Sequence, residues 1–296
     1  MLDTKIYTLL KVAETGSFTR AAASLGLTQP AVSQHIKALE EELGITLFER
    51  NGNRIILTKQ GENAVNTANA MLGMYSKLLE ELSGSIGGTK EINIGITHTI
   101  ESNRITDILA GYASNSNRLT IKLITGTRSK IIRRLKNYEL DLAIVDGDVP
   151  DEDLDSKPLG MDQLVLIVSP DNTIAQKKAV SIDDIKREKL ILRLPGSGTN
   201  NMFKSSIESL GLDIDEFNVI LEVDNVATIK DLVKRDYGVS VLPRSACLGE
   251  LKSKQLYAVS IDKLNMERII NIVYTDGSQY ASFAEEIINL YGNDIL

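Results

Sequence analysis

The sequence has little of the chemistry that builds disulfides or metal sites. Its 296 residues include one cysteine, Cys247, and two histidines. A single cysteine excludes an internal disulfide, and so few histidines argue against a His/Cys metal site. No run of about 18 apolar residues occurs, so no transmembrane helix is expected. The first residues lack the basic start and apolar run of a secretory signal, which predicts a cytoplasmic chain without cofactor or membrane partner.

Acidic and basic residues are unevenly distributed. The net charge of −7, from 40 acidic and 33 basic residues, at first argues against nucleic acid. Two windows, residues 17–38 and 50–59, nevertheless contain basic residues and no acidic ones. Such windows either arise by chance or are suited to phosphate groups. With 43% hydrophobic and 25% charged residues, the chain should be globular and larger than one typical domain.

The first sixty residues predict a helix-turn-helix. After an amphipathic helix around Leu9, Ser17 is a plausible N-cap for a short helix that ends at Leu25. Thr28 then caps a third helix, with Pro30 in its first turn. Two short helices joined by a tight turn with a glycine are typical of this motif. The buried face of the third helix is predicted from apolar residues spaced by four, three and four: Val32, Ile36, Leu39 and Leu43.

The other face of the third helix carries amide, hydroxyl and ammonium groups, from Gln29, Ser33, Gln34 and Lys37. These groups can contact base edges or phosphates in a DNA groove. The alternative is a plain solvated helix, but such a helix normally mixes both signs of charge. Asn51-Gly52 between apolar runs then predicts a basic β-hairpin, a wing beside the helix.

In these N-terminal motifs the sequence resembles the LysR-type transcriptional regulators. The resemblance rests on Phe18-Thr19-Arg20-Ala21-Ala22, Gln29-Pro30-Ala31-Val32-Ser33, Leu47-Phe48-Glu49-Arg50 and Leu57-Thr58, with Gly61. It implies a bacterial DNA-binding regulator with an all-α winged helix-turn-helix. Asn53 departs from the family, where a basic residue is common, which implies a weaker grip by the wing. The DNA-contacting residues implied are Thr19, Arg20, Thr28, Gln29, Pro30, Ser33, Gln34, Lys37, Arg50 and Arg54.

A long helix is predicted from Thr58 to about Leu82, followed by a glycine-rich hinge. One stripe of this helix has the spacing of a coiled coil: Ala64, Ala68, Met71, Tyr75, Leu78 and Leu82. A helix packed on its own domain is the alternative, although the narrow stripe favours pairing of two chains. The resemblance implies a homodimer that assembles into a homotetramer, a roughly palindromic site on double-stranded promoter DNA, and contact with RNA polymerase.

Strands and helices alternate in the rest of the chain, which predicts a mostly parallel sheet in two α/β lobes. Asp141–Val145, Leu164–Val168 and Pro195–Thr199 resemble the sulfur-assimilation and carbon-fixation subgroup of the same family. This implies an effector domain of the periplasmic-binding-protein-like (type II) fold. Asp146-Gly147-Asp148 replaces the Glu-Gly-Pro frequent in that subgroup. The expected parts are a DNA-binding domain at 1–58, a dimerisation helix and hinge at 59–88, and an effector domain at 89–296. Within the effector domain, we expect lobe I at about 89–165 and 268–296 and lobe II at about 166–267.

Four loops between a strand and the following helix or segment are rich in hydroxyls, amides or glycine. Helix starts offer free N–H groups and a positive dipole end, so an anion is expected there, although these residues are also ordinary caps. Arg128 is the best partner for a carboxylate or oxyanion. The sequence at 196–201 lacks the third glycine of a dinucleotide-binding motif. The expected effector-binding residues are Thr97, His98, Thr99, Thr127, Arg128, Ser129, Gly196, Ser197, Gly198, Thr199 and Asn225.

Three functions are compatible with two α/β lobes. A solute-binding protein is disfavoured by the missing signal and the extra N-terminal residues. An enzyme is disfavoured because no nucleophile elbow, metal cluster or P-loop occurs, so no catalytic residue is assigned. We therefore predict a transcriptional regulator of the LysR type, whose promoter binding or activation responds to a small, anionic effector between the lobes.

Overall fold

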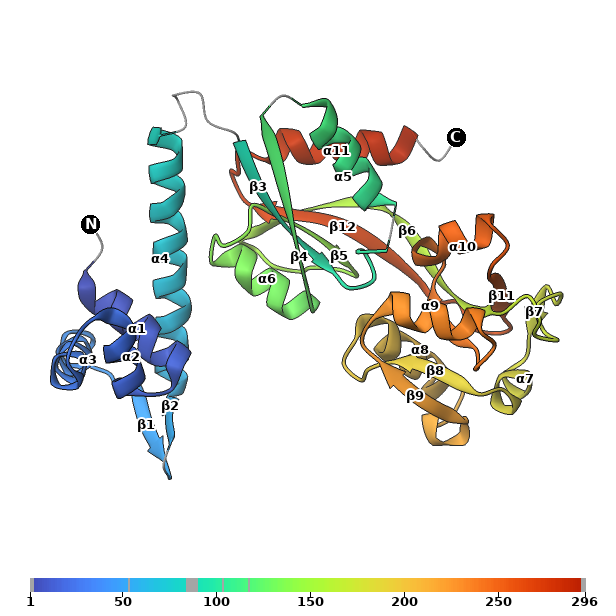
Figure 1. Ribbon diagram of the computed structural model, residues 1–296, viewed down its shortest axis with the longest axis horizontal. Coiled ribbons are helices and arrows are strands. Elements are labelled where there is room, and N and C mark those ends of the chain that lie inside the picture. Colours follow the sequence, from blue (N-terminus) through green and yellow to red (C-terminus); the bar gives the residue numbers. More distant parts are fainter. Residues whose placement is uncertain (1–2, 53, 84–89, 103, 117, 294–296) are drawn as a thin grey trace. The chain divides into compact units, whose positions relative to one another are not determined.

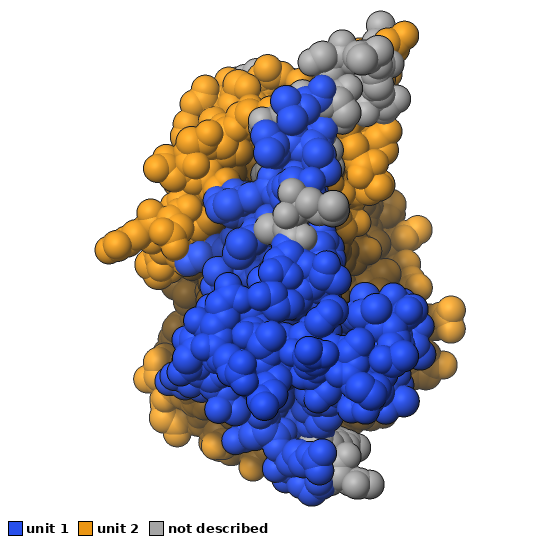
Figure 2. All heavy atoms as spheres, turned by 90° about the vertical axis from the view of Figure 1, so that its left-hand side faces the viewer, with its two compact units in different colours: residues 1–88, 136–139 blue, residues 89–135, 140–296 orange. Residues whose placement is uncertain are grey.

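The computed structural model describes residues 3–52, 54–83, 90–102, 104–116 and 118–293 (Figure 1). Of the expected hinge, which begins at Ser83, residues 84–88 lie outside the described residues, and so does Asn53 of the wing. The chain divides into two compact units, which Figure 2 shows in different colours. One comprises residues 1–88 and 136–139, and the other residues 89–135 and 140–296.

The N-terminal unit is a winged helix-turn-helix followed by a long helix. Its elements are α1 (Thr4–Thr15), α2 (Phe18–Leu25), α3 (Gln29–Leu43), β1 (Phe48–Asn51), β2 (Arg54–Leu57) and α4 (Lys59–Ser83). The predicted caps are confirmed: Ser17 accepts from the amide of Arg20, and Thr28 accepts from that of Ala31. In the predicted hairpin, Asn51 lies opposite Arg54 in the antiparallel register.

The core of this unit forms where the three helices meet. Val32, Ile36 and Leu39 are buried in it as predicted. Leu43 is 49% exposed, so its prediction was wrong; it is the last residue of α3, one turn beyond the buried Leu39. Gly61 in α4 fits closely against the segment before the wing, since a Cβ there would lie 2.0 Å from the carbonyl oxygen of Leu47.

The C-terminal unit contains one eight-stranded sheet in the order β4-β3-β5-β12-β6-β11-β7, with β10 also paired to β6. The prediction of a mostly parallel sheet was wrong. β3 (Lys90–Thr97) is parallel to β4 (Leu119–Gly126) and β5 (Leu142–Asp146), but β12 (Glu267–Thr275) is antiparallel to β5 and to β6 (Leu154–Val168). Alternating strands and helices indicate crossovers, but they do not indicate the direction of a strand that returns from the other lobe.

Helices cover both faces of the first lobe. α5 (Ile105–Asn115) and α11 (Ala281–Asn293) pack on one face, where apolar side chains of β3, β5 and β12 form a cluster with them. α6 (Arg128–Lys136) covers the other face through Ile131 and Leu135. The carboxyl ends of β3, β4 and β5 remain free to carry loops.

The second lobe is built around the last residues of β6, from Leu164 to Val168, which pair with β10 (Ser240–Pro243) and β11 (Tyr257–Ile261). β6 therefore belongs to both lobes and joins them. A separate parallel pair lies beside this sheet, β8 (Leu190–Arg193) and β9 (Val219–Val223). The remaining elements are β7 (Ala179–Val180), α7 (Ile182–Arg187), α8 (Gly198–Glu208), η1 (Ile214–Glu216), α9 (Val226–Lys234), η2 (Arg244–Cys247) and α10 (Leu248–Lys252).

Candidate functional site

The polar face of α3 is free to meet a ligand. The side of the helix opposite its buried residues is exposed at every predicted position, and Thr28 at its start is exposed as well. The exposed set is Gln29, Pro30, Ser33, Gln34 and Lys37. Amide, hydroxyl and ammonium groups are therefore presented together along one side of a helix, as a groove-reading helix requires.

The acidic residues that follow on α3 have partners within the unit. Glu40 accepts from the amides of Leu47 and Phe48 at 2.7 and 3.4 Å, so it fixes the segment before the wing. Glu42 pairs with Lys5 at 2.5 Å. Glu41 lies 3.7 Å from Lys37, but both side chains are well exposed, and such pairs are weak. Lys37 thus remains available to a phosphate group.

The other predicted DNA contacts lie on α2 and the wing. Thr19 and Arg20 are exposed on α2, and the Arg20 guanidinium donates to the carbonyl of Thr15, which ties it to the end of α1. Arg50 is exposed on β1, and Arg54 begins β2 opposite Asn51. Four basic residues thus belong to the polar helix or to its neighbouring elements.

The predicted pairing stripe on α4 divides into two parts. Ala68 is buried and Ala64 partly buried against the core of their own unit, which agrees with the alternative of a helix packed on its own domain. Farther along, Met71, Leu78 and Leu82 are exposed, and Tyr75 is half-buried. Met74 and Leu79, which the stripe does not include, are also exposed. The exposed apolar surface is therefore wider and shorter than the predicted stripe.

A cavity of about 570 Å³ lies between the two lobes of the C-terminal unit. Strand-end loops of the first lobe and the loop before α8 of the second lobe form its walls. Nine of the predicted effector residues line it: Thr97, His98, Thr99, Thr127, Arg128, Ser129, Gly196, Ser197 and Gly198.

Two predicted effector residues do not line this cavity. Thr199 is buried within the second lobe, with 2% of its surface exposed. Asn225 caps α9 by accepting from the amide of Thr228 at 3.0 Å, as the alternative of an ordinary cap predicts. It borders a separate hollow of about 230 Å³ together with His98.

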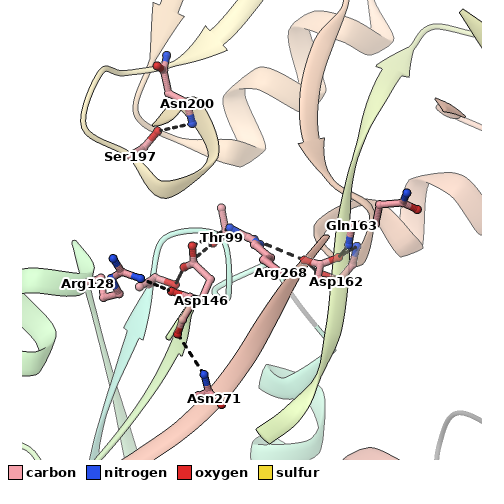
Figure 3. A network of polar contacts seen from close by, with 12 residues as sticks. Thr99, Arg128, Asp146, Asp162, Gln163, Ser197, Asn200, Arg268 and Asn271 are labelled. Atoms are coloured by element: carbon pink, nitrogen blue, oxygen red, sulfur yellow. Dashed lines mark hydrogen bonds and ion pairs between the residues drawn. The ribbon is translucent and has the colours of Figure 1, made fainter. Parts of the chain in front are cut away.

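Arg128 is held at the cavity by main-chain atoms. Its Nη1 donates to the carbonyl oxygens of Asp146 and Asp148 at 3.2 and 3.5 Å (Figure 3). A Cβ on Gly147 would lie 2.5 Å from the same nitrogen, so the guanidinium rests against bare backbone. Within the described part of the chain, no carboxylate forms an ion pair with Arg128. Its charge is therefore available to a ligand.

Asp146, at the end of β5, is a charged residue of the cavity that sequence reasoning did not select. Its Oδ1 accepts from the hydroxyls of Thr97 and Thr99 at 2.6 and 3.4 Å, and its Oδ2 pairs with Arg268 Nη1 at 2.7 Å (Figure 3). Burial by itself would raise the pKa of Asp146, but the Arg268 charge and the Thr97 hydroxyl outweigh it and keep the pKa below its ordinary value. The carboxylate is thus ionised at neutral pH.

Arg268 connects the cavity to the second lobe. This residue of β12 is almost fully buried and also lies 3.4 Å from Asp162 of β6. Asp162 in turn accepts from the amide and hydroxyl of Ser245, in η2, at 3.1 and 2.7 Å. The ionic network Asp146–Arg268–Asp162 therefore extends from the cavity to an element of the other lobe. The sequence signal that could have identified Arg268 is a basic residue directly before the apolar residues of β12.

Arg193 brings a second buried guanidinium to the cavity, from the end of β8. Its Nη2 pairs with Asp224 at 3.0 Å, while Nε and Nη1 have no hydrogen-bond partner among the described residues. Burial lowers the pKa of Arg193, and the Asp224 carboxylate opposes that effect. The cavity lining thus holds three arginines, at 128, 193 and 268, and two aspartates, at 146 and 224.

The described residues contain no group of three His, Cys, Asp or Glu side chains placed to hold a metal ion. None of the described helices is both long and apolar enough to cross a membrane. The candidate sites in the described residues are the polar face of α3 in the N-terminal unit and the arginine-rich cavity in the C-terminal unit.

Comparison with known families covers almost the whole chain. Residues 4–62 match the family described as bacterial regulatory helix-turn-helix protein, lysR family. Residues 86–292 match the LysR substrate binding domain. The chain is also similar to a probable RuBisCO transcriptional regulator of Cyanophora paradoxa, at 29% identity over 96% of this chain and 90% of that protein.

Solved structures with the same fold include full-length CbnR complexed with its target DNA. It superimposes with a TM-score of 0.68 at 17% identity, over 98% of this chain and 100% of that one. The Synechocystis PCC6803 CcmR regulatory domain, solved in complex with 2-PG, matches with a TM-score of 0.60 at 23% identity, over 69% of this chain and 98% of that one.

Proposed function

This chain belongs to the LysR family of bacterial transcriptional regulators, and on that premise we propose which residues bind promoter DNA and which bind the effector. The family regulates transcription and is not enzymatic. In this chain, α3 and the β1–β2 wing contact double-stranded promoter DNA. A small anion in the cavity between the lobes controls that contact.

The exposed polar face of α3 carries the DNA-binding part of the proposal. Gln29, Ser33 and Gln34 are the groups that can hydrogen-bond to base edges in the major groove. Lys37 and Arg50 are the proposed phosphate contacts, which add affinity without sequence preference. The acidic residues of α3 do not oppose DNA binding, because Glu40 accepts from the amide of Leu47 and Glu42 pairs with Lys5.

Binding of the full chain to its own promoter fragment tests this assignment. Gln29→Ala should weaken specific binding and reduce discrimination between bases, by about 1–3 kcal/mol for a bidentate contact. Arg50→Ala should weaken specific and non-specific binding alike and reduce the salt slope by about 0.9. Lys11→Ala, on α1 and paired with Glu14, is the control for lost positive charge. Unchanged binding in both test variants would refute the contact assignment.

The exposed apolar part of α4 supports the proposed assembly. Met71, Leu78 and Leu82, together with Met74 and Leu79, would be covered by the same helix of a second chain. Such a homodimer would bind a roughly palindromic site, and two dimers would form a tetramer. Leu78→Glu should dissociate the dimer in sedimentation experiments. The proposed location is the cytoplasm, where promoter DNA and RNA polymerase are found.

One observation carries the proposal of an anionic effector. Arg128 faces a cavity lined with hydroxyls, and its hydrogen bonds go only to main-chain carbonyls in the described structure. A planar guanidinium of this kind suits a carboxylate or phosphate group. The CcmR regulatory domain, solved in complex with 2-PG, provides a precedent for a bound small molecule in this fold. We therefore propose a carboxylate or phosphate compound as the effector.

Isothermal titration calorimetry of the full chain with 2-PG, sulfate and small carboxylates tests this proposal. Arg128→Gln should abolish or strongly weaken binding. Arg133→Gln, an exposed arginine on the same helix but outside the cavity lining, should bind as the wild type does. The bound anion should change promoter affinity by roughly 5- to 150-fold. Binding that survives Arg128→Gln unchanged would refute the placement.

A further inference from the structure

The hydroxyls of Thr97 and Thr99, which the sequence predicts to bind the effector, already bind a carboxylate of the protein itself. Thr97 and Thr99 both donate to the carboxylate of Asp146, at 2.6 and 3.4 Å. The second oxygen of that carboxylate receives Arg268 at 2.7 Å. Two hydroxyls and a guanidinium around one carboxylate are what a bound anion would itself require. The Asp146 side chain thus satisfies the best-formed anion site of the cavity.

The same carboxylate also reaches the opposite lobe. A Cβ added to Gly198 would lie 2.5 Å from Asp146 Oδ2, so only glycine allows this approach. Gly198 is the first residue of the eleven-residue helix α8, whose N-terminus carries a partial positive charge and is capped by Ser197 (Figure 3). Asp146 ends β5 of the first lobe, so its carboxylate is a direct contact between the lobes.

We propose that Asp146 is an internal substitute for the effector's anionic group and that the effector binds by displacing it. This inference rests on the anion site proposed above and identifies a residue that sets its affinity. The carboxylate neutralises Arg268 and lies against the start of α8. An incoming anion must take over these contacts. Asp146 therefore opposes anion binding, although it lines the anion's own cavity.

The charge balance of the cavity supports this competition. Asp146 and Asp162 together balance Arg268, and Asp224 balances Arg193. Neutralising Asp146 would leave Arg268 with a single carboxylate partner at 3.4 Å. The cavity would then attract an anion at two positions, Arg128 and Arg268, instead of one. Removal of a residue that contacts the effector site should accordingly strengthen anion binding, the opposite of the result for Arg128.

Calorimetric titration of the full chain with sulfate and with acetate tests the proposal. Asp146→Asn should bind sulfate about tenfold more tightly than the wild type. Asp146→Ala should in addition bind acetate more tightly than the wild type does, because acetate fills the place of the missing carboxylate. Asp155→Asn is the matched control, because it removes the same charge from an exposed side chain of the same unit that lies outside the cavity lining. It should bind both anions as the wild type does.

The outcomes separate this inference from the proposed function. Sulfate or 2-PG binding to the wild type, with no gain in Asp146→Asn, would overturn the displacement by Asp146 and leave the anion site standing. Absence of sulfate, acetate and 2-PG binding in all these chains would overturn both. Equal gains in Asp146→Asn and Asp155→Asn would indicate long-range charge alone and would also overturn the displacement by Asp146. Asp146→Asn keeps the side-chain shape, so it answers the question even where Asp146→Ala does not fold.

Discussion

Removal of Arg268 should strongly destabilise the C-terminal unit. Its side chain is 3% exposed and lies between Asp146 and Asp162, at 2.7 and 3.4 Å. Arg268→Met keeps much of the volume but leaves two carboxylates close together without their cation. Removing one partner from a buried ion pair costs about 3–5 kcal/mol, because the remaining charge is desolvated and unpaired.

That cost in the free energy of unfolding can be converted into a decrease of the melting temperature. For a domain of this size, about 1 kcal/mol corresponds to a shift of roughly 2–4 °C, so the variant should melt roughly 6–20 °C below the wild type. Lys157→Met is the control, since Lys157 pairs with Glu285 at 2.5 Å on the surface of the same unit. Solvent screening leaves such pairs with little effect, so this variant should melt with the wild type.

The pH dependence gives the same reasoning a second test. In the wild type the pKa of Asp146 is lowered, so the stability it contributes is complete at neutral pH and is lost as pH falls through that lowered pKa. In Arg268→Met the largest opposing charge is gone, so burial shifts the pKa of Asp146 upward from its wild-type value. The deficit of the variant should be largest at pH 7 and smaller at pH 4, because the carboxyl takes up its proton at a higher pH than in the wild type.

Differential scanning calorimetry of the full chain between these two pH values measures both effects. The transition to follow is the one that belongs to the C-terminal unit. A decrease at pH 7 no larger than that of Lys157→Met would refute the predicted cost of leaving the buried carboxylates without their cation. A deficit that stays constant with pH would show that Asp146 does not carry the uncompensated charge.

Two further predictions concern backbone packing and thiol chemistry. Gly61→Ala should destabilise the N-terminal unit by about 1–3 kcal/mol, since its Cβ would lie 2.0 Å from the carbonyl oxygen of Leu47. Gly111→Ala, in an open position of α5, should instead stabilise by about 0.5–1 kcal/mol, and equal effects in thermal unfolding would contradict this. Burial raises the pKa of Cys247 to about 12, so the native thiol should not react with a disulfide reagent at pH 8 until the chain unfolds.

The parts of the fold that the sequence predicted are those determined by neighbouring residues. Ser17 and Thr28 specify two helix starts because a side-chain oxygen meets an amide a few residues along the chain. The register of the wing follows from its short turn in the same way. The prediction for Leu43 failed because spacing alone does not show where a core ends along a helix. Ala64 and Ala68 fit a coiled-coil spacing equally well while packing on their own unit.

The sheet of the C-terminal unit was less predictable, because its strand order depends on distant pairing. β12 lies between β5 and β6 and is antiparallel to both, although more than a hundred residues separate it from β5. The residues 154–162 of β6 were missed, since that half carries several charged and polar side chains. The short elements β7, α7, β11 and α10 were missed as well.

The two candidate sites differ in how far local sequence specifies them. The DNA-binding face belongs to one helix, so its residue types and spacing already define a surface. The effector cavity brings together Asp146, Arg193 and Arg268 from three separate strands, and its charges act on one another. The loops could be located from their helix caps, but the buried charges that decide what binds there could not. A change such as Asp146-Gly147-Asp148 can therefore alter ligand preference while every local pattern of the fold stays the same. Effector chemistry within this family should accordingly be compared through buried charges at the lobe boundary, rather than through the loops that line the cavity.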